Sequence, residues 1–368
     1  MPDPRVTKLA HVLVNYSLNI QPGDELAIMT TPVADELNLA ILKEAVLAGA
    51  HVLTNSETIA ADEIFLKYAS DTQLDHVSPV FKMVAESYDA YIEIMAPTNT
   101  RGLSGVNPER MARKQRATMP YFQTAMQRAM SGAFKLCITL YPTNAGAQEA
   151  DMSLSDYEDF VYTAGLLDLD DPVAAWKAEG ERQEKLVRWL AGKDQVVMKG
   201  ENIDLTLSIA ERNFLKACGR ENFPDGEIYT SPVETSVNGW VRFGYPAIYK
   251  GREVEDIELW LEDGKIVKET ASKGRDFLTG LLNTDAAARY LGEWGIGTNY
   301  QIQKFTKNML FDEKIGGTFH FAVGYGFPDA GGKAESGLHW DMLCNMTDSE
   351  VSVDGELFYK DGHFVIGE

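Results

Sequence analysis

The feature that most constrains the fold is a change in the hydrophobic pattern near residue 194. Before it, short apolar runs such as GDELAIMTT (residues 23–31) and HVLTNS (51–56) alternate with long amphipathic stretches such as ADELNLAILKEAVLAGA (34–50). Strands separated by helices of this length are typical of a parallel sheet with crossover helices. We therefore expect an N-terminal parallel α/β domain, Rossmann- or flavodoxin-like, over residues 1–193.

The pattern after residue 194 is that of an antiparallel sheet. Short alternating runs follow one another, among them GWVRFGYPAIY (239–249) and IELWLEDGKIVKET (257–270), and the turn EDGK inside the latter is a hairpin signal. The run NTDAAARYLG (283–292) predicts one helix within this half. We expect residues 194–368 to form a mostly antiparallel, β-rich α+β domain.

Composition excludes several classes of function. Lys and Arg number 34 and Asp and Glu 55, which gives a formal net charge of −21 at pH 7. A surface this negative repels phosphate backbones, so nucleic acid is not an expected partner. No stretch approaches the roughly 18 apolar residues that a membrane span requires, and the N-terminal residues are typical of a helix rather than of a signal peptide. Three widely separated cysteines predict buried thiols in a cytoplasmic protein.

Two of the six histidines stand in strand-like runs beside apolar residues. In GLHWDMLC (337–344), alternation places His339 and Asp341 on one face of a strand and their apolar neighbours on the other. In GGTFHFAVGYG (316–326), His320 lies between two phenylalanines. A link rich in turn residues joins the runs, so we expect the two strands to be neighbours. These side chains suit either a hydrogen-bonded structural group or a set of metal ligands.

Two glutamates stand at positions that suit the same site. Glu227 opens the run EIYTSPV after NFPDG, and Glu293 follows the expected helix over residues 283–292. A carboxylate is unfavourable at the negative end of a helix dipole unless a cation offsets it. Taken alone, each glutamate is more typical of a solvated surface residue than of a ligand.

Several motifs of the second half resemble the thermophilic aminopeptidases, the aminopeptidase T or M29 group of metallopeptidases. The motifs are NFPDGEIYTSPVETSVNG, YPAIYKGREVE, LGEWGIGTN, FTKNMLFDEKIGGTFHFAVG and GGKAESGLHWDM, which together span roughly residues 220–345. The resemblance implies two divalent cations close together. Their ligands in this chain would be Glu227, Glu293, His320, His339 and Asp341. Nitrogen and oxygen ligands without thiolate suit zinc, cobalt or manganese.

The resemblance also implies an activity, which is hydrolysis of the N-terminal peptide bond of short peptides by a water that two metal ions activate. Glu293 is implied to lie near that water and to move its proton to the leaving amine. A homodimer is implied as well, with short peptides as the substrates.

The sequence departs from the family pattern at one position. Seven residues beyond His320, where the family commonly places a tyrosine that assists at the oxyanion, this chain has Phe327. Tyr325 lies two positions earlier, on the same face if the strand persists. We predict that Tyr325 substitutes as a catalytic residue, and ordinary strand packing is an equal alternative.

A second function fits part of the same residue set. His320, His339 and Asp341 match the two-histidine, one-carboxylate triad of non-haem iron oxygenases. A ring-cleaving Fe(II) dioxygenase is therefore the alternative, and a protein that has kept only the fold is a third interpretation. Glu227 and Glu293 argue against the dioxygenase because they supply ligands for a second ion.

Overall fold

The computed structural model of the protein describes residues 3–366. The chain divides into two compact units, residues 1–173 with 219–224 and residues 174–218 with 225–368. The expected boundary after residue 193 lies at the far end of a helix, α9 (Pro172–Leu190), most of which belongs to the second unit. Leu186 and Leu190 of this helix are part of the second unit's hydrophobic core. That the two units are independent domains stays a prediction.

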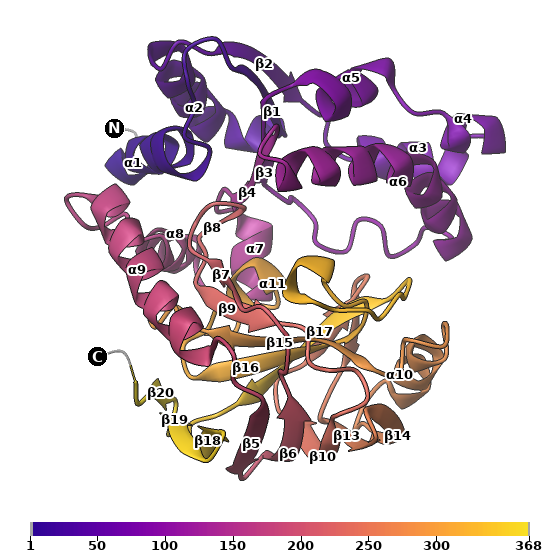
Figure 1. The fold of residues 1–368 in the computed structure, drawn as a ribbon. Coiled ribbons are helices and arrows are strands. Elements are labelled where there is room, and N and C mark those ends of the chain that lie inside the picture. The colour runs from indigo at the N-terminus through magenta and orange to yellow at the C-terminus, as the bar shows by residue number, and fades with distance from the viewer. Residues whose placement is uncertain (1–2, 367–368) are drawn as a thin grey trace. The chain divides into compact units, whose positions relative to one another are not determined.

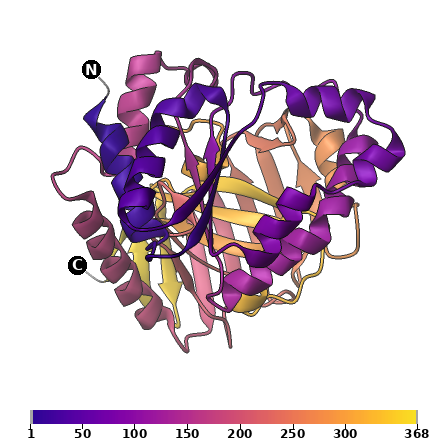
Figure 2. The ribbon, with the colours of Figure 1, turned by 90° about the horizontal axis from the view of Figure 1, so that it is seen from above.

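The first unit is a parallel sheet with helices on both faces. Its strands are β1 (Glu25–Thr30), β2 (His51–Ser56), β3 (Ala90–Met95), β4 (Lys135–Leu140) and β8 (Asn222–Phe223). Its helices are α1 (Pro4–Val12), α2 (Asp35–Leu47), α3 (Ala61–Tyr68), α4 (Asp71–Asp75), α5 (Pro79–Ser87), α6 (Pro108–Met130), α7 (Asn144–Glu149) and α8 (Leu154–Ala164). The helices α1 and α2 lie on one side of the strands, and α5 and α6 on the other (Figures 1 and 2).

The strand order of this sheet is β2-β1-β3-β4-β8, which is the flavodoxin-like order, and every neighbouring pair is parallel. The inner strands are largely buried because helices cover both faces. The long helix α6 begins where the Asn107 side chain accepts a hydrogen bond from the N–H of Glu109 at 2.8 Å, with Pro108 in the first turn.

The second unit consists mainly of two antiparallel sheets. The eight-stranded sheet has β5 (Gln195–Gly200), β6 (Ile203–Ser208), β10 (Asn238–Phe243), β13 (Ile257–Glu262), β14 (Lys265–Thr270), β18 (Ser349–Val353), β19 (Glu356–Lys360) and β20 (His363–Phe364). The other sheet, called the site sheet below, has β7 (Leu215–Ala217), β9 (Glu227–Thr230), β15 (Leu291–Gly297), β16 (Thr318–Gly324) and β17 (His339–Asn345). A small hairpin, β11 (Ala247–Tyr249) and β12 (Arg252–Val254), and the helices α10 (Arg275–Leu282) and α11 (Met309–Asp312) complete the unit.

One face of the site sheet packs against the eight-stranded sheet. Phe321 of β16 and Phe243 of β10 meet edge to face with ring centroids 6.3 Å apart, and Trp294 of β15 is fully buried. Each such aromatic side chain contributes about 1.5–3 kcal/mol when it is buried. Because successive strand residues point to opposite faces, this packing also determines which residues point away from the core.

The helix expected over residues 283–292 does not form, so that prediction is wrong. The side chain of Asp285 instead accepts hydrogen bonds from the N–H groups of Ala287 and Ala288 at 3.0 and 2.9 Å, which stabilises a turn. The chain then enters β15, so Glu293 is a strand residue. The helix-dipole argument for Glu293 therefore does not apply.

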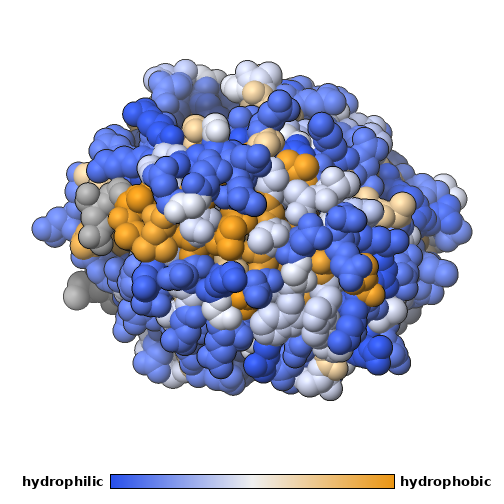
Figure 3. Space-filling view, turned by 60° about the horizontal axis from the view of Figure 1, so that its bottom comes forward, coloured by the Kyte–Doolittle hydropathy of each residue, from blue (hydrophilic) through white to orange (hydrophobic). Residues whose placement is uncertain are grey.

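None of the described helices is both long and apolar enough to cross a membrane. In the face seen in Figure 3, hydrophilic residues cover most of the surface and hydrophobic residues gather in a few groups. Cys137, Cys218 and Cys344 are buried, as expected, and none of the three is in a disulfide.

Candidate metal centre

Alternate residues of the site sheet point away from the core and make up what we call the ligand face. In order across the sheet, the strand register places on it His339, Asp341, Leu343 and Asn345 of β17, Thr318, His320, Ala322 and Gly324 of β16, Glu293, Gly295 and Gly297 of β15, Glu227 and Tyr229 of β9, and Leu215 and Ala217 of β7. All five ligands expected from the sequence lie on this face. The strands of His320 and of His339 are direct neighbours, as predicted.

The structure brings the five side chains together. Nε2 of His320 is 3.1 Å from Oε2 of Glu227 and 3.6 Å from Oε1 of Glu293. Nε2 of His339 is 3.3 Å from Oε2 of Glu293 and 3.6 Å from Oδ2 of Asp341. The side chains form two triads, and within each triad the ligand atoms lie within 4.8 Å of one another. Glu293 belongs to both triads and directs one oxygen toward each histidine.

The two triads differ in exposure. Glu227, Glu293 and His320 are buried, whereas His339 and Asp341 are partly exposed. Oδ1 of Asp341 is a buried atom that accepts no hydrogen bond, and the buried Oε2 of Glu227 faces the His320 imidazole at 3.1 Å. Because a buried carboxylate oxygen is costly unless a donor or a positive charge meets it, both atoms fit a site whose positive charge comes from a bound cation.

The pKa shifts within the cluster also indicate a site that requires positive charge. Burial acts to raise the pKa of Glu293, but His320 and His339 outweigh it and hold that pKa at about 2. Burial acts to lower the pKa of His339, but Asp341 and Glu293 outweigh it and raise that pKa to about 10. Without metal, the histidines thus carry the positive charge that the carboxylates require. Divalent ions would displace these protons.

His339 is oriented as a metal ligand usually is. Its Nδ1 is 3.1 Å from the carbonyl oxygen of Tyr325, so the Nδ1 proton is donated to the backbone and Nε2 faces the carboxylates. Nδ1 of His320 is buried and makes no hydrogen bond. The backbone of Tyr325 therefore has a positioning role that the sequence did not indicate.

Gly295 makes room for His320, and sequence reasoning missed it. The two residues are paired across β15 and β16, and a Cβ atom on Gly295 would lie only 1.9 Å from Nε2 of His320. The imidazole therefore lies over Gly295. The available signal was the alternation of glycines in GEWGIG, because glycine inside a buried strand often marks a close approach.

Lys314 is a second residue that sequence reasoning missed. Its side chain is fully buried, and Nζ donates to Oε1 of Glu227 at 3.0 Å and to Glu313, with Asp225 Oδ1 3.9 Å away. Burial acts to lower the pKa of Lys314, but Glu227 and Glu313 hold it well above its usual value. Lys314 thus occupies one oxygen of Glu227 and leaves the other for His320.

The condition attached to Tyr325 is not met. The strand β16 ends at Gly324, whose φ of +100° turns the chain off the extended path. The ring of Phe327 contacts the imidazole of His339 at a centroid distance of 5.1 Å, and the Tyr325 ring contacts Phe327 at 5.9 Å. A catalytic role for the Tyr325 hydroxyl stays a prediction.

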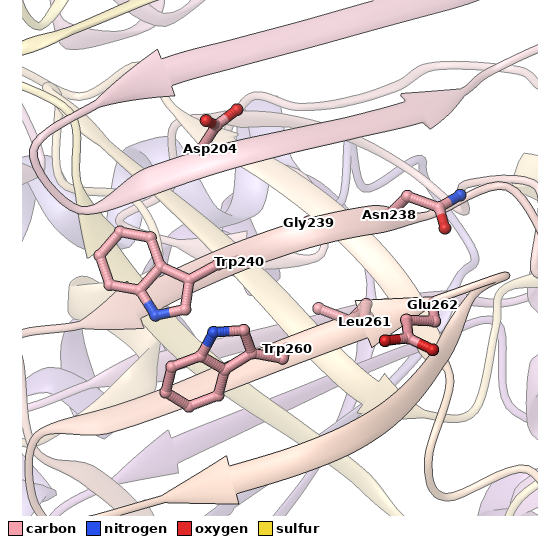
Figure 4. A pocket seen from close by; sticks show the side chains of 7 residues that line it. All are labelled: Asp204, Asn238, Gly239, Trp240, Trp260, Leu261 and Glu262. Carbon is pink, nitrogen blue, oxygen red and sulfur yellow. The ribbon is translucent and has the colours of Figure 1, made fainter.

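A hollow elsewhere in the second unit is separate from this centre. It has a volume of about 570 Å³ and is lined by residues of β6, β10 and β13, including Trp240 and Trp260 (Figure 4). Asp204 and Glu262 are its carboxylates, and the picture shows them on different strands. None of the predicted site residues lines it.

Residues 3–364 match the thermophilic metalloprotease (M29) family. The chain belongs to this family. Aminopeptidase 2 of Geobacillus stearothermophilus is 26% identical over 400 residues, covering 98% of this chain and 95% of the relative. Aminopeptidase T of Thermus thermophilus is 26% identical over 394 residues, covering 96% and 95%. The family expected from the sequence motifs is confirmed.

Two solved structures share the fold. Wild-type AmpT from Thermus thermophilus superimposes with a TM-score of 0.84 at 22% identity, covering 99% of both chains. A 2,5-dihydroxypyridine dioxygenase from Pseudomonas putida KT2440 superimposes with a TM-score of 0.63 at 14% identity, covering 98% of this chain and 97% of the dioxygenase. These likenesses confirm the expected α/β fold class. They do not decide the chemistry, which depends on the site residues.

We predict that Gly295→Ala weakens metal binding, because the new Cβ atom would force the His320 imidazole out of its triad. The expected loss is about 10- to 100-fold in affinity for zinc or cobalt, measured by competition with a chelator dye. Gly244→Ala is the control, since nothing lies within 4 Å of a Cβ atom there. Equal affinities of the two variants would contradict this account of Gly295.

We predict that Lys314→Met destabilises the metal-free protein by about 3–5 kcal/mol, because Glu227 and its neighbours would lose their buried cation. Urea unfolding in the presence of a chelator measures the change. Lys273→Met is the control, since its side chain is 56% exposed and its surface pairs contribute about 0–1 kcal/mol. A loss no greater than that of the control would show that Lys314 does not compensate the carboxylates.

Proposed function

We propose that this protein is a metal-dependent aminopeptidase that hydrolyses the N-terminal peptide bond of short peptides. The observation that carries the proposal is the pair of ligand triads sharing Glu293, in a chain that belongs to a metalloprotease family. Relatives named aminopeptidase 2 and aminopeptidase T, which match along almost their whole length, support the exopeptidase assignment.

The centre suits two divalent cations. One triad is Glu227, Glu293 and His320, and the other is Glu293, His339 and Asp341. These nitrogen and oxygen donors suit zinc, cobalt or manganese. When bound, such ions polarise the scissile carbonyl and lower the pKa of a water molecule from about 15.7 toward about 7.

The side chains of the two triads would have different roles in the reaction. The more exposed triad, with His339 and Asp341, is the side from which a peptide reaches the centre. The carboxylate of Glu293 accepts a proton from the attacking water as the water oxygen bonds to the carbonyl carbon. The same proton passes to the amine nitrogen when the C–N bond breaks. Burial of Glu227 and His320 keeps the inner triad out of bulk water.

The Fe(II) dioxygenase is the second candidate. The fold shared with 2,5-dihydroxypyridine dioxygenase favours it, as does the set of His320, His339 and Asp341. Glu227 and Glu293 argue against it, because Glu227 lies against His320 and Glu293 against both histidines, which with Asp341 makes three carboxylates in all. A single Fe(II) with the facial triad has no use for the other two.

We further propose that the enzyme works in the cytoplasm as a homodimer that binds neither nucleic acid nor membrane. The three buried cysteines, none in a disulfide, suit a reducing compartment. Large exposed apolar side chains on α3 and α6, such as Tyr68 and Phe122, are 80% and 54% exposed and suit a contact between copies.

The proposed activity predicts that metal-stripped protein regains hydrolysis of aminoacyl p-nitroanilides when zinc, cobalt or manganese is added. The same substrates with an acetylated N-terminus should remain intact, because an aminopeptidase requires the free amine. Metal analysis should find about two such ions per chain. One iron per chain, together with oxygen uptake on a dihydroxylated aromatic ring, would establish the dioxygenase instead.

Glu293→Gln should leave the fold intact but lower kcat by about 10²–10⁴, because the amide cannot carry the proton. Glu350→Gln is the matched control, since Glu350 lies on β18 with its side chain 57% exposed. Circular dichroism checks the fold, and initial rates with saturating metal measure kcat. A Glu293→Gln variant with most of its activity would remove Glu293 from the proton transfer.

A further inference from the structure

Peptide hydrolysis builds up negative charge on the substrate's carbonyl oxygen. When the water oxygen bonds to the carbonyl carbon, the π electron pair moves onto that oxygen. A neutral hydrogen-bond donor aimed at it stabilises the transition state and typically contributes 10²–10³ in kcat, by an order-of-magnitude estimate. The ligand face of the site sheet is where such a donor has to be.

Two side chains of that face have a neutral hydroxyl, Thr318 and Tyr229, and Thr318 donates its hydroxyl to the carbonyl oxygen of Ile315 at 2.9 Å. The three carboxylates accept hydrogen bonds, and the two imidazoles face those carboxylates. Leu343, Ala322 and the glycines of the face have no polar side-chain atom. The amide of Asn345 is at the opposite end of β17 from His339, so among the residues that the described strands place on the ligand face, Tyr229 is the hydroxyl donor beside the triads.

Tyr229 lies beside the inner triad. It pairs with Gly295, which pairs on its other side with His320. Gly295 has no side chain, and the imidazole of His320 lies over it. Two strand spacings, roughly 10 Å, separate the backbones of Tyr229 and His320, and no side chain of β15 stands between them.

Tyr229 also borders the outer triad through Phe327. The rings of Tyr229 and Phe327 meet edge to face with centroids 5.5 Å apart, and Phe327 contacts His339 at 5.1 Å. Tyr229 therefore lies beside the inner triad across Gly295, and the Phe327 ring contacts both Tyr229 and His339 of the outer triad. The Tyr325 ring contacts the Phe327 ring at a centroid distance of 5.9 Å, and Tyr325 follows Gly324, where β16 has ended.

We propose that Tyr229 is the catalytic hydroxyl that donates a hydrogen bond to the oxyanion, an inference that rests on the proposed peptidase function. The phenol keeps its proton throughout. As the C–N bond breaks, the oxyanion pair re-forms the carbonyl, the bond pair goes to nitrogen, and the nitrogen takes the proton from Glu293. Phe327 holds the Tyr229 ring in place from the side of His339.

Tyr229→Phe is the test, with Tyr141→Phe as the matched control, since the Tyr141 hydroxyl donates to an exposed carboxylate, Glu36, in the first unit. We expect Tyr229→Phe to lower kcat by about 10²–10³, with KM and metal content close to wild type, because only the oxyanion contact is lost. Tyr141→Phe should keep kcat within about twofold, and Tyr325→Phe is measured beside it because that hydroxyl is the rival for the same role. Binding of an aminoalkylphosphonic acid, whose tetrahedral oxygens carry the charge of the oxyanion, should weaken at least tenfold in Tyr229→Phe, while binding of the product amino acid does not change.

The double variant Tyr229→Phe/Phe327→Tyr places the hydroxyl on residue 327 instead of residue 229. Its kcat should be at least tenfold higher than that of Tyr229→Phe. Wild-type kcat and phosphonate affinity in Tyr229→Phe would overturn the role of Tyr229, and so would a loss confined to Tyr325→Phe. A loss of kcat in Tyr229→Phe with unchanged phosphonate affinity would assign the effect to packing and overturn it too. A wild-type protein that cleaves no peptide would instead overturn the proposed function itself.

Discussion

The alternation of side chains across the site sheet is the constraint on which the rest of the second unit depends. On β16 and β17, one set of alternate residues, which includes Phe321 and Met342, is buried in the core, and the other set carries His320 and Asp341. A slip of one residue in the pairing would place imidazoles and carboxylates in the core and aromatic rings in the site. The free energy of packing the aromatic face therefore also holds the ligands in register, so that stability and site geometry come from the same strands.

The electrostatic cost of the site is the second constraint. Three carboxylates close together are unfavourable unless positive charge is near, and the protein supplies part of it permanently through buried Lys314. The rest comes from groups that exchange, either protons on the two histidines or bound cations. Because Lys314 occupies one oxygen of Glu227 and both oxygens of Glu293 face histidines, these two carboxylates are oriented before any ion arrives. Such preorganisation lowers the cost of binding the ions.

How much of this the sequence predicts depends on how local each signal is. The shared face of His339 and Asp341 is a property of neighbouring residues in one strand, and simple alternation predicted it. The environment of Glu293 was predicted wrongly, because NTDAAARYLG has helix-forming residues but Asp285 closes a turn there. Gly295 and Tyr229 act through partners in other strands, and the pairing of β9, β15 and β16 is not visible along the chain. No local pattern singles out Lys314, because its burial depends partly on Glu227, which is far from it in sequence.

The fold by itself leaves two chemistries open, since a peptidase relative and a dioxygenase both superimpose on nearly the whole chain. The two chemistries differ in how many carboxylates beside the two histidines the reaction can use. A facial triad needs one, whereas here Glu227 and Glu293 add two more, and Glu293 faces both histidines. Burying a carboxylate is costly unless a positive charge close to it compensates the loss of water. The surplus of negative charge on this one face, rather than the architecture beneath it, is therefore the strongest physical argument for a centre of two ions and for hydrolysis.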